Sequence, residues 1–177
     1  MKTVTMSLLL LILSLAGYGQ AEREIEIDSS NALQYYYRGI LKVSDGDYEG
    51  AISDFTKAIE LDPSEPAYFG IRGFYNAESG DYEGAISDLT KFIELAPSNA
   101  KTYPSRGDAK AALGDYKGAI SDYSKAIELD PTEGLAYLGR GLAKVILGDI
   151  DRGCLDLLKA EELGANDAHE QIKQNCK

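Results

Sequence analysis

The sequence feature that most constrains the fold is a segment that recurs every 34 residues. It reads GDYEGAISD from Gly46 and again from Gly80, and it reads GDYKGAISD from Gly114. A diverged copy begins with GDI at Gly148. A fixed period of this length is typical of a stack of like supersecondary units, none of which can bury its apolar face alone. The sequence therefore predicts a repeat protein.

Each unit is predicted to be a hairpin of two helices. In the first unit, Gly46 follows the first helix, where glycine is favoured because it adopts left-handed backbone at little steric cost. Asp47 is placed to accept a hydrogen bond from the free amides that begin the second helix. Pro63 ends that helix, since the residue before a proline avoids the helical region. The unit is therefore two antiparallel helices joined by a tight turn.

The small and apolar positions of each unit resemble those of the tetratricopeptide repeat (TPR). In the first unit the family's small residue, its two alanines, its aromatic residue and its closing proline are matched by Gly39, Ala51, Ala58, Phe55 and Pro63. The resemblance implies an all-α fold, a right-handed superhelical solenoid of four TPR helical hairpins with a C-terminal capping helix. It also implies that the first helices of the hairpins line a concave surface.

Two positions depart from the family's pattern. The usual tryptophan near the start of each unit is replaced by Tyr35, Phe69, Tyr103 and Tyr137. The usual tyrosine in the middle of the first helix is replaced by Lys42, Asn76, Lys110 and Lys144. These changes leave the predicted fold in place and make the second position more polar.

The repeats divide the chain into seven predicted segments. These are a signal peptide (1–19), a flexible acidic leader (20–31), TPR 1 (32–65), TPR 2 (66–99), TPR 3 (100–133), a degenerate TPR 4 (134–165) and a capping helix (166–177). A solenoid needs such a cap because its last unit has no following unit to cover it. His169, the single histidine, lies in the cap and is expected on its surface.

The first residues have the layout of a secretory signal peptide. Lys2 is followed by an apolar stretch from Leu8 to Ala16 and by small residues at Gly17 and Gly19. The alternative is an uncleaved membrane anchor, but this stretch is shorter than the roughly 20 apolar residues that span a bilayer. We therefore expect a bacterial-type exported protein, periplasmic or secreted, with no integral membrane span after cleavage.

The charge of the chain argues against two classes of partner. With 29 acidic and 18 basic side chains, the formal net charge is −11. A surface of this sign repels the phosphates of nucleic acids and of anionic membranes. We expect no nucleic-acid partner.

Two charged sets also follow the 34-residue spacing. They are Arg38, Arg72, Arg106 and Arg140 in the first helices, and Asp54, Asp88, Asp122 and Asp156 in the second helices. One interpretation is a structural ladder of Arg–Asp ion pairs, within or between hairpins, because a guanidinium fork matches a fixed carboxylate. The alternative is two solvated faces. Under the ladder, Arg106→Ala should destabilise the fold more than Lys110→Ala.

The two cysteines, Cys154 and Cys176, leave two alternatives open. In an exported protein a disulfide between them would join the cap to the last hairpin. Otherwise both are free thiols, with Cys154 as a small apolar residue. Two cysteines and one histidine are too few for a structural zinc site, so we expect no metal.

Pro104 lies early in the first helix of the third unit. Proline is tolerated in the first turn, where the amides have no partner, and deeper positions would kink the helix. We therefore expect this helix to begin late or irregularly. One interpretation is that this irregular start widens the groove. The alternative is that it has no functional effect.

The concave surface implied by the resemblance is mostly apolar, with aromatic rings. The predicted partner groove comprises Tyr36, Ile40, Val43, Phe74, Ala77, Lys101, Asp108, Leu138 and Leu142. Such a groove suits an amphipathic helix or an extended apolar peptide. The Lys and Asn that grip a terminal carboxylate in chaperone-binding TPR domains are absent from the matching positions. An alternative for the row that begins at Leu135 is that it packs against the capping helix.

The expected function is that of a non-catalytic protein–protein interaction scaffold, which binds a protein or peptide in its concave groove. The alternative is a self-associating structural module that forms homo-oligomers. An enzyme is not expected, since the sequence contains no phosphate-binding loop, nucleophile–base pair or metal cluster outside the repeat pattern. No catalytic residue and no cofactor are predicted.

Overall fold

A computed structural model describes residues 30–176, so the predicted signal peptide and most of the predicted leader lie outside the described residues. Within 30–176 the regular secondary structure consists of nine helices and no strand. The helices are α2 (Ala32–Ser44), α3 (Tyr48–Leu61), α4 (Pro66–Glu78), α5 (Tyr82–Leu95), α6 (Thr102–Ala112), α7 (Tyr116–Leu129), α8 (Gly134–Ile146), α9 (Ile150–Glu162) and α10 (Ala168–Asn175).

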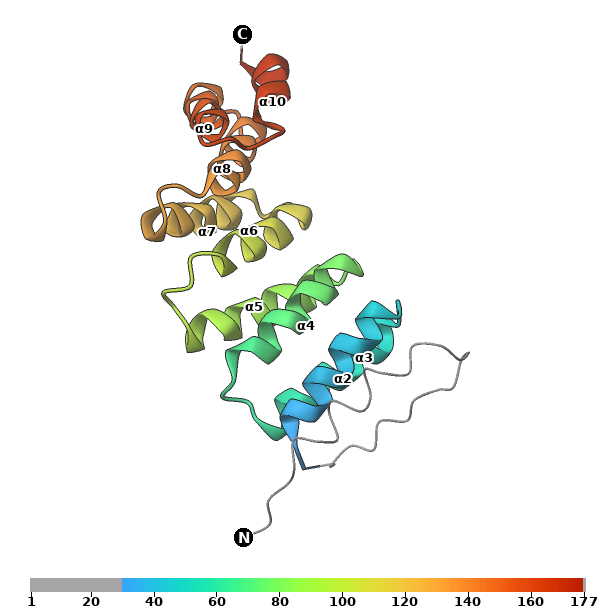
Figure 1. Cartoon of the computed structure of the whole chain (residues 1–177). Coiled ribbons are helices and arrows are strands. Elements are labelled where there is room, and N and C mark those ends of the chain that lie inside the picture. Colours follow the sequence, from blue (N-terminus) through green and yellow to red (C-terminus); the bar gives the residue numbers. More distant parts are fainter. Residues whose placement is uncertain (1–29, 177) are drawn as a thin grey trace.

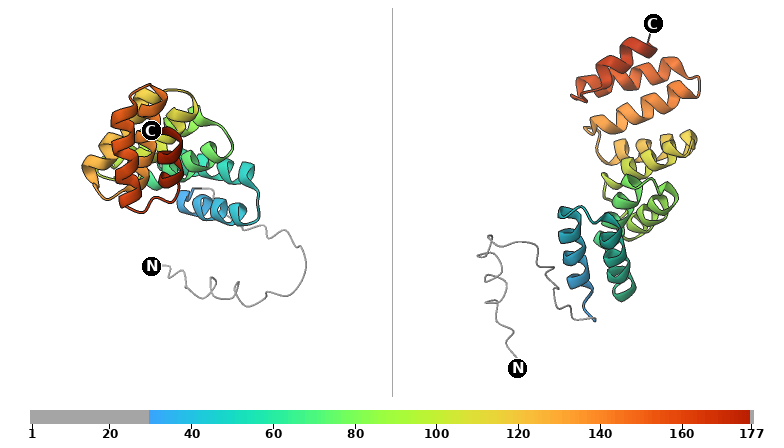
Figure 2. Two further views of the ribbon diagram at one scale, coloured as in Figure 1. Left: turned by 90° about the horizontal axis from the view of Figure 1, so that it is seen from above. Right: turned by 90° about the vertical axis from the view of Figure 1, so that its right-hand side faces the viewer.

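The helices form four hairpins that stack in chain order. Helix α2 packs on α3, α4 on α5, α6 on α7 and α8 on α9, and each hairpin packs on the next through α3–α4, α5–α6 and α7–α8. Figure 1 shows the resulting solenoid, in which the first and last hairpins lie at opposite ends. Figure 2 shows the same stack from two further sides, with α10 closing the C-terminal end. The predicted all-α solenoid with a short C-terminal helix is confirmed.

Glycine and aspartate make the turn inside each hairpin. Gly46 adopts a left-handed backbone, with φ of 83°, immediately after Asp45, the C-cap residue of α2. Asp47 then caps α3, and its side chain accepts a hydrogen bond from the amide of Gly50 at 2.9 Å. The same pair of residues makes the next two turns. In the fourth hairpin Asp149 makes no such cap bond and pairs instead with Arg152.

Small residues let the two helices of a hairpin approach closely. Ala51, Phe55 and Ala58 of α3 are fully buried. The ring of Phe55 lies directly beneath Gly39 of α2, where an added Cβ would come within 2.4 Å of a ring carbon. The glycine thus sets the spacing of α2 and α3.

The third hairpin begins irregularly, as expected from Pro104. Helix α6 begins at Thr102, two residues after the position that the 34-residue spacing from Pro66 would give. Pro104 is its third residue, in the first turn, where its missing amide hydrogen breaks no bond. Lys101, at the start of the helix, supplies no side-chain cap.

Helix α10 covers the last hairpin. Its Ala168 is fully buried, and the helix packs mainly on α9. A disulfide joins Cys154 of α9 to Cys176, with 5.7 Å between the two Cα atoms. The cap does not cover Leu135, which is 62% exposed, so the alternative that the Leu135 row packs against the cap is wrong for its first residue. The reason is that α10 contacts α9 far more than α8.

Candidate binding groove and its polar framework

The repeated arginines and aspartates meet inside each hairpin. In the third hairpin, Arg106 donates from Nε to Asp122 Oδ2 at 2.9 Å and from Nη2 to Oδ1 at 2.6 Å. The same two-bond fork joins the other pairs, Arg38–Asp54, Arg72–Asp88 and Arg140–Asp156. The four carboxylates are buried, so each fork supplies a counter-charge that burial requires.

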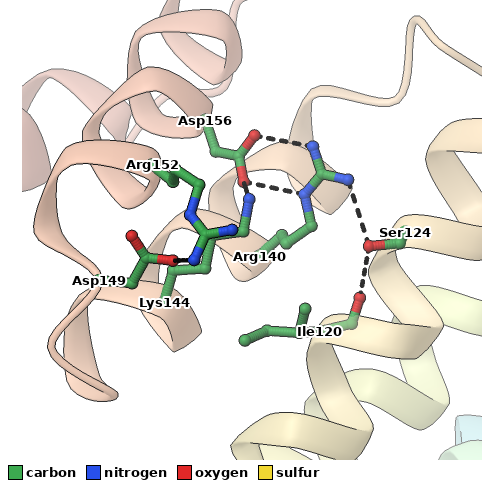
Figure 3. Close-up of polar contacts among 7 residues, drawn as sticks. All are labelled: Ile120, Ser124, Arg140, Lys144, Asp149, Arg152 and Asp156. Carbon is green, nitrogen blue, oxygen red and sulfur yellow. Dashed lines mark hydrogen bonds and ion pairs between the residues drawn. The ribbon is translucent and has the colours of Figure 1, made fainter.

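The third arginine nitrogen links one hairpin to the hairpin before it. Arg106 donates from Nη1 to Thr90 Oγ1 at 3.0 Å, and Arg72 makes the same bond to Thr56. Figure 3 shows the last of these links, from Arg140 to Ser124 at 3.2 Å. The arginines therefore bond their own hairpin through aspartate and the preceding hairpin through a hydroxyl.

A third set of residues shares the buried carboxylates, and sequence reasoning missed it. Lys110 donates from Nζ to Asp122 Oδ2 at 2.7 Å, and Lys144 makes the same contact with Asp156 (Figure 3). Lys42 Nζ lies 3.0 Å from Asp54, and Asn76 replaces the lysine beside Asp88. The available signal was their spacing, because each follows its arginine by four residues and so shares its helix face. Lys110 is thus part of the network and cannot serve as a control outside it.

Asp54, the buried carboxylate of the first hairpin, shows how burial and hydrogen bonding compete in this network. Burial opposes ionisation of Asp54, but the hydrogen bonds from Arg38 and Lys42 outweigh it and hold the pKa of its carboxyl below the ordinary value. The bond to Asp54 also raises the pKa of Arg38. Both groups are therefore charged at neutral pH.

A hollow of about 650 Å³ lies between the first helices of the third and fourth hairpins. We call it the α6–α8 groove. Leu135 and Ile146, at its two ends, are 62% and 57% exposed. Its lining residues are Lys101, Pro104, Ser105, Asp108, Ala111, Tyr116, Tyr123, Glu133, Leu135, Leu138, Gly139, Leu142, Ala143 and Ile146.

The structure brings four of the nine predicted groove residues together here and leaves five elsewhere. Those in the α6–α8 groove are Lys101, Asp108, Leu138 and Leu142. Those outside it lie on α2 and α4, namely Tyr36, Ile40, Val43, Phe74 and Ala77. The sequence prediction spread the groove evenly over four units, whereas this hollow belongs to the last two.

Aromatic packing occupies the corresponding surface of the first two hairpins. The ring of Tyr36 lies 5.3 Å from that of Tyr68, between ring centroids, and 6.0 Å from that of Phe55. Phe92 of α5 lies against Gly70, where a Cβ would approach its ring to 2.8 Å. Phe74 remains 51% exposed. This half of the solenoid therefore presents ring faces and edges.

The carboxylate of Asp108, on α6, lines the α6–α8 groove. Asp108 is accessible to solvent, and its Oδ1 accepts a hydrogen bond of 2.6 Å from the hydroxyl of Tyr123. Tyr123 is buried and reaches Asp108 past Gly139, where a Cβ would lie only 2.5 Å from its ring. The glycine is therefore needed for the tyrosine to reach the groove wall.

The surroundings of this pair disfavour negative charge. Although water reaches Asp108, the groove walls crowd its carboxyl, and this partial desolvation raises its pKa against the lowering effect of the bond from Tyr123. Burial and the neighbouring carboxylate raise the pKa of Tyr123, so its hydroxyl stays protonated. Within 30–176 the repeated aspartates of the second helices form ion pairs, whereas Asp108 forms none.

Two further properties of the described residues bear on function. Nowhere in 30–176 do three or more His, Cys, Asp or Glu side chains gather as a metal site would require. None of the helices in that range is both long enough and apolar enough to cross a membrane.

Comparison with known proteins explains the hairpin stack. Residues 32–65 match the family model described as tetratricopeptide repeat, and residues 107–148 match one described as TPR repeat. Tetratricopeptide repeats are thus identified in these two segments of the chain. No curated protein matches it significantly.

Solved TPR structures share the fold. The crystal structure of MamA is 27% identical, with a TM-score of 0.74, and the match covers 80% of this chain and 83% of MamA. The first TPR of Spaghetti (RPAP3), bound to HSP90 peptide SRMEEVD, is 29% identical, with a TM-score of 0.64 and coverage of 70% and 98%. YrrB, described as a TPR protein with an unusual peptide-binding site, is 23% identical, with a TM-score of 0.76 and coverage of 82% and 76%, and this likeness concerns the fold alone.

Proposed function

We propose that this protein is a non-catalytic scaffold that binds a peptide or protein segment in the α6–α8 groove. The observation that carries the proposal is the hollow of about 650 Å³ between α6 and α8, lined by exposed and half-buried leucines. A groove of this size lies within the range of protein ligand sites. Peptide binding by a structural neighbour, the first TPR of Spaghetti, supports the proposal.

Preorganisation is the proposed mechanism of binding. The Arg106–Asp122 fork holds α6 to α7, and the bond from Arg140 to Ser124 holds α8 to α7. Both walls of the groove are therefore set before a partner arrives. A partner then loses less free energy to ordering of the site than it would on a flexible surface.

Site-specific photocrosslinking tests the proposal. A photocrosslinking amino acid in place of Leu138, in cells that produce the protein, should capture a partner through the groove. Leu142→Glu places a charge on the same wall and should abolish the crosslink. Phe74→Glu is the matched control, because Phe74 is an exposed apolar residue outside the groove. Equal capture by the two folded variants would count against the groove.

We also propose that the protein is exported through its N-terminal signal peptide. The Cys154–Cys176 disulfide supports this location, because such bonds persist in oxidising compartments and are rare in the cytosol. N-terminal sequencing of protein recovered from the periplasm or medium should give a chain that begins at Gln20. Recovery of the chain with an intact N-terminus from the cytosol would contradict export.

The second candidate function is self-association, and the outer side of α2 favours it. Tyr37 and Leu41 are 59% and 50% exposed, at positions equivalent to Ile71 and Tyr75 of α4. In the second hairpin Tyr75 packs on Phe55 and Tyr48 of the preceding hairpin. Light scattering over a range of concentrations should show a dimer that Leu41→Glu dissociates. A monomer at every concentration would exclude this candidate.

A further inference from the structure

The α6–α8 groove contains a set of three substitutions that occurs in no other unit. Asp108 stands where the other units have Ile40, Phe74 and Leu142. Tyr123 stands where they have Phe55, Leu89 and Leu157, and Gly139 stands where they have Tyr37, Ile71 and Ser105. The fold therefore does not require a carboxylate, a phenol or a glycine at these positions.

The three substitutions act together. Gly139 leaves room for the ring of Tyr123, and the Tyr123 hydroxyl then donates to Asp108 Oδ1 at 2.6 Å. That bond orients the carboxylate on the groove wall. The second oxygen, Oδ2, has no hydrogen-bond or ion-pair partner among residues 30–176. A carboxylate held in one orientation with one oxygen available can accept from a ligand.

The charges around Asp108 decide which ligand it suits. Lys101 is a cationic side chain of the lining, but it forms no ion pair with Asp108 in residues 30–176, and its charge helps to lower the pKa of Asp130, which lies outside the groove. Glu133 lines the groove as a second carboxylate, and the whole chain has a formal net charge of −11. Much of the remaining lining is apolar and includes Leu135, Leu138, Leu142 and Ile146. This combination repels an acidic ligand and attracts a cation attached to apolar groups.

We infer that the α6–α8 groove takes an amphipathic peptide segment whose Lys or Arg side chain pairs with Asp108, while flanking apolar side chains lie on Leu138 and Leu142. This inference rests on the proposed function and names the chemistry of its partner. It differs from a clamp of lysines for a terminal carboxylate, because the fixed charge in this groove is negative. The raised pKa of Asp108 agrees with it, since a bound cation would supply the counter-charge that the carboxylate lacks.

Selection from a random peptide library tests the inference without a known partner. Phage displaying random 12-residue peptides would be selected on the immobilised full chain, after removal of phage that also bind Leu142→Lys, whose positive charge in the groove should repel a cationic peptide. The enriched peptides should contain Lys or Arg next to apolar residues. Synthetic, fluorescently labelled copies would then be titrated by anisotropy in 0.15 M salt, each beside a copy with norleucine in place of the cation.

The expected result is about a tenfold preference for the cationic peptide, as for a solvent-accessible interfacial charge pair. Asp108→Asn should remove this preference, and it keeps an acceptor for Tyr123, so the fold is retained. Asp151→Asn makes the same change of charge at an exposed site on α9 and should leave the preference intact.

Two other outcomes overturn different statements. Enriched peptides that bind the groove without a cationic preference, or whose preference survives Asp108→Asn, would refute the role of Asp108 and leave the groove scaffold standing. A library in which no peptide distinguishes the wild-type chain from Leu142→Lys would refute the groove scaffold and the inference together. Melting temperatures of the three variants separate loss of binding from loss of fold.

Discussion

The first and third hairpins contain the same Arg–Asp fork, yet its surroundings differ. Arg106 of the third hairpin bonds Asp122 and also Thr90 of the hairpin before it, and its side chain is 16% exposed. Arg38 of the first hairpin bonds Asp54 alone, and its side chain is 31% exposed. No hairpin precedes α2 among residues 30–176, so Nη1 of Arg38 has no equivalent hydroxyl there. The Arg–Asp pair of the third hairpin therefore lies inside the polar network, whereas the pair of the first hairpin lies at the end of that network.

This difference shows that a 34-residue unit needs the preceding unit to satisfy all the hydrogen bonds of its arginine. An arginine is satisfied by its own aspartate and by a hydroxyl supplied from the preceding unit. In the fourth unit Leu158 occupies the hydroxyl position, and the residue 34 positions after Arg140 is Gln174, so in residues 30–176 no further arginine continues the series. The polar network therefore ends where the stack ends, as a chain of nearest-neighbour contacts should.

The largest expected effect is loss of the buried carboxylate in the third hairpin. Asp122→Ala leaves Arg106 and Lys110 without their common partner and should cost about 3 kcal/mol of unfolding free energy. Asp54→Ala should cost about half as much, because Arg38 and Lys42 are each 31% exposed and water can solvate them. Denaturant unfolding measures both values. Equal costs would show that position in the stack has no influence.

The second-largest loss of stability is expected from reduction of the Cys154–Cys176 disulfide, and it should be confined to the C-terminal end of the stack. The bond closes a separation of 22 residues, for which loss costs about 2 to 3 kcal/mol. Because contacts in the stack are between neighbours, hydrogen exchange should quicken in α9 and α10 and stay unchanged in α2 and α3. Cys154→Ser with Cys176→Ser should reproduce the effect of a reductant. Faster exchange throughout the chain would contradict the local picture.

A smaller effect is expected from the link between hairpins. Thr90→Val removes the hydroxyl that accepts from Arg106 Nη1 and should cost about 1 kcal/mol. In a double-mutant cycle with Arg106→Met, the two changes should be non-additive because each removes the same bond. Thr132→Val is the matched control, since Thr132 is an exposed hydroxyl outside the arginine network. Additive costs for Thr90 and Arg106 would contradict the link.

The sequence alone supported much of the fold for a physical reason. Turn chemistry acts locally, so Gly46 and Asp47 could be assigned from their neighbours in the chain, and a fixed period requires identical units to stack. The ladder was harder, because Lys110 was compared with the tyrosine of the family's pattern and its place four residues after Arg106 was not used. A carboxylate with two cations could have been expected from that spacing.

The groove could not be located because large and small residues compensate across helices. Phe92 stands where other units have alanine, and it occupies the space over Gly70 in the second hairpin. Likewise, Tyr123 of the third hairpin occupies the space over Gly139 of the fourth hairpin. Periodicity identifies the positions that face a neighbour, but it does not say which neighbour fills which space. The hollow between α6 and α8 is a product of those pairings.

The smallest expected effect is the pH dependence that Asp54 gives to the stability of the first hairpin. The pKa of Asp54 is lowered in the folded chain, where bonds from Arg38 and Lys42 outweigh the effect of burial. A lowered pKa means that the ionised pair stabilises the fold above about pH 4, the ordinary range of an aspartate. This contribution is lost as the pH falls through the folded-state pKa. The contribution of Asp108 to stability changes with pH in the opposite direction. Because its pKa is raised in the folded chain, protonation of its carboxyl at low pH favours the fold.

The stability difference between the wild-type chain and Asp54→Asn should therefore shrink between pH 5 and pH 3. Because Arg38 and Lys42 are partly exposed, solvent screens the pair and the change should be small. Amide exchange in α2 and α3, measured over this pH range and corrected for its intrinsic rate, isolates the first hairpin from the rest of the stack. Asp108→Asn should show a difference that changes with pH in the other direction. If the stability difference for Asp54→Asn does not change with pH, the Arg38–Asp54 pair stabilises the ionised carboxylate no better than water does. The contrast with the Arg106–Asp122 pair of the third hairpin would then be larger than proposed.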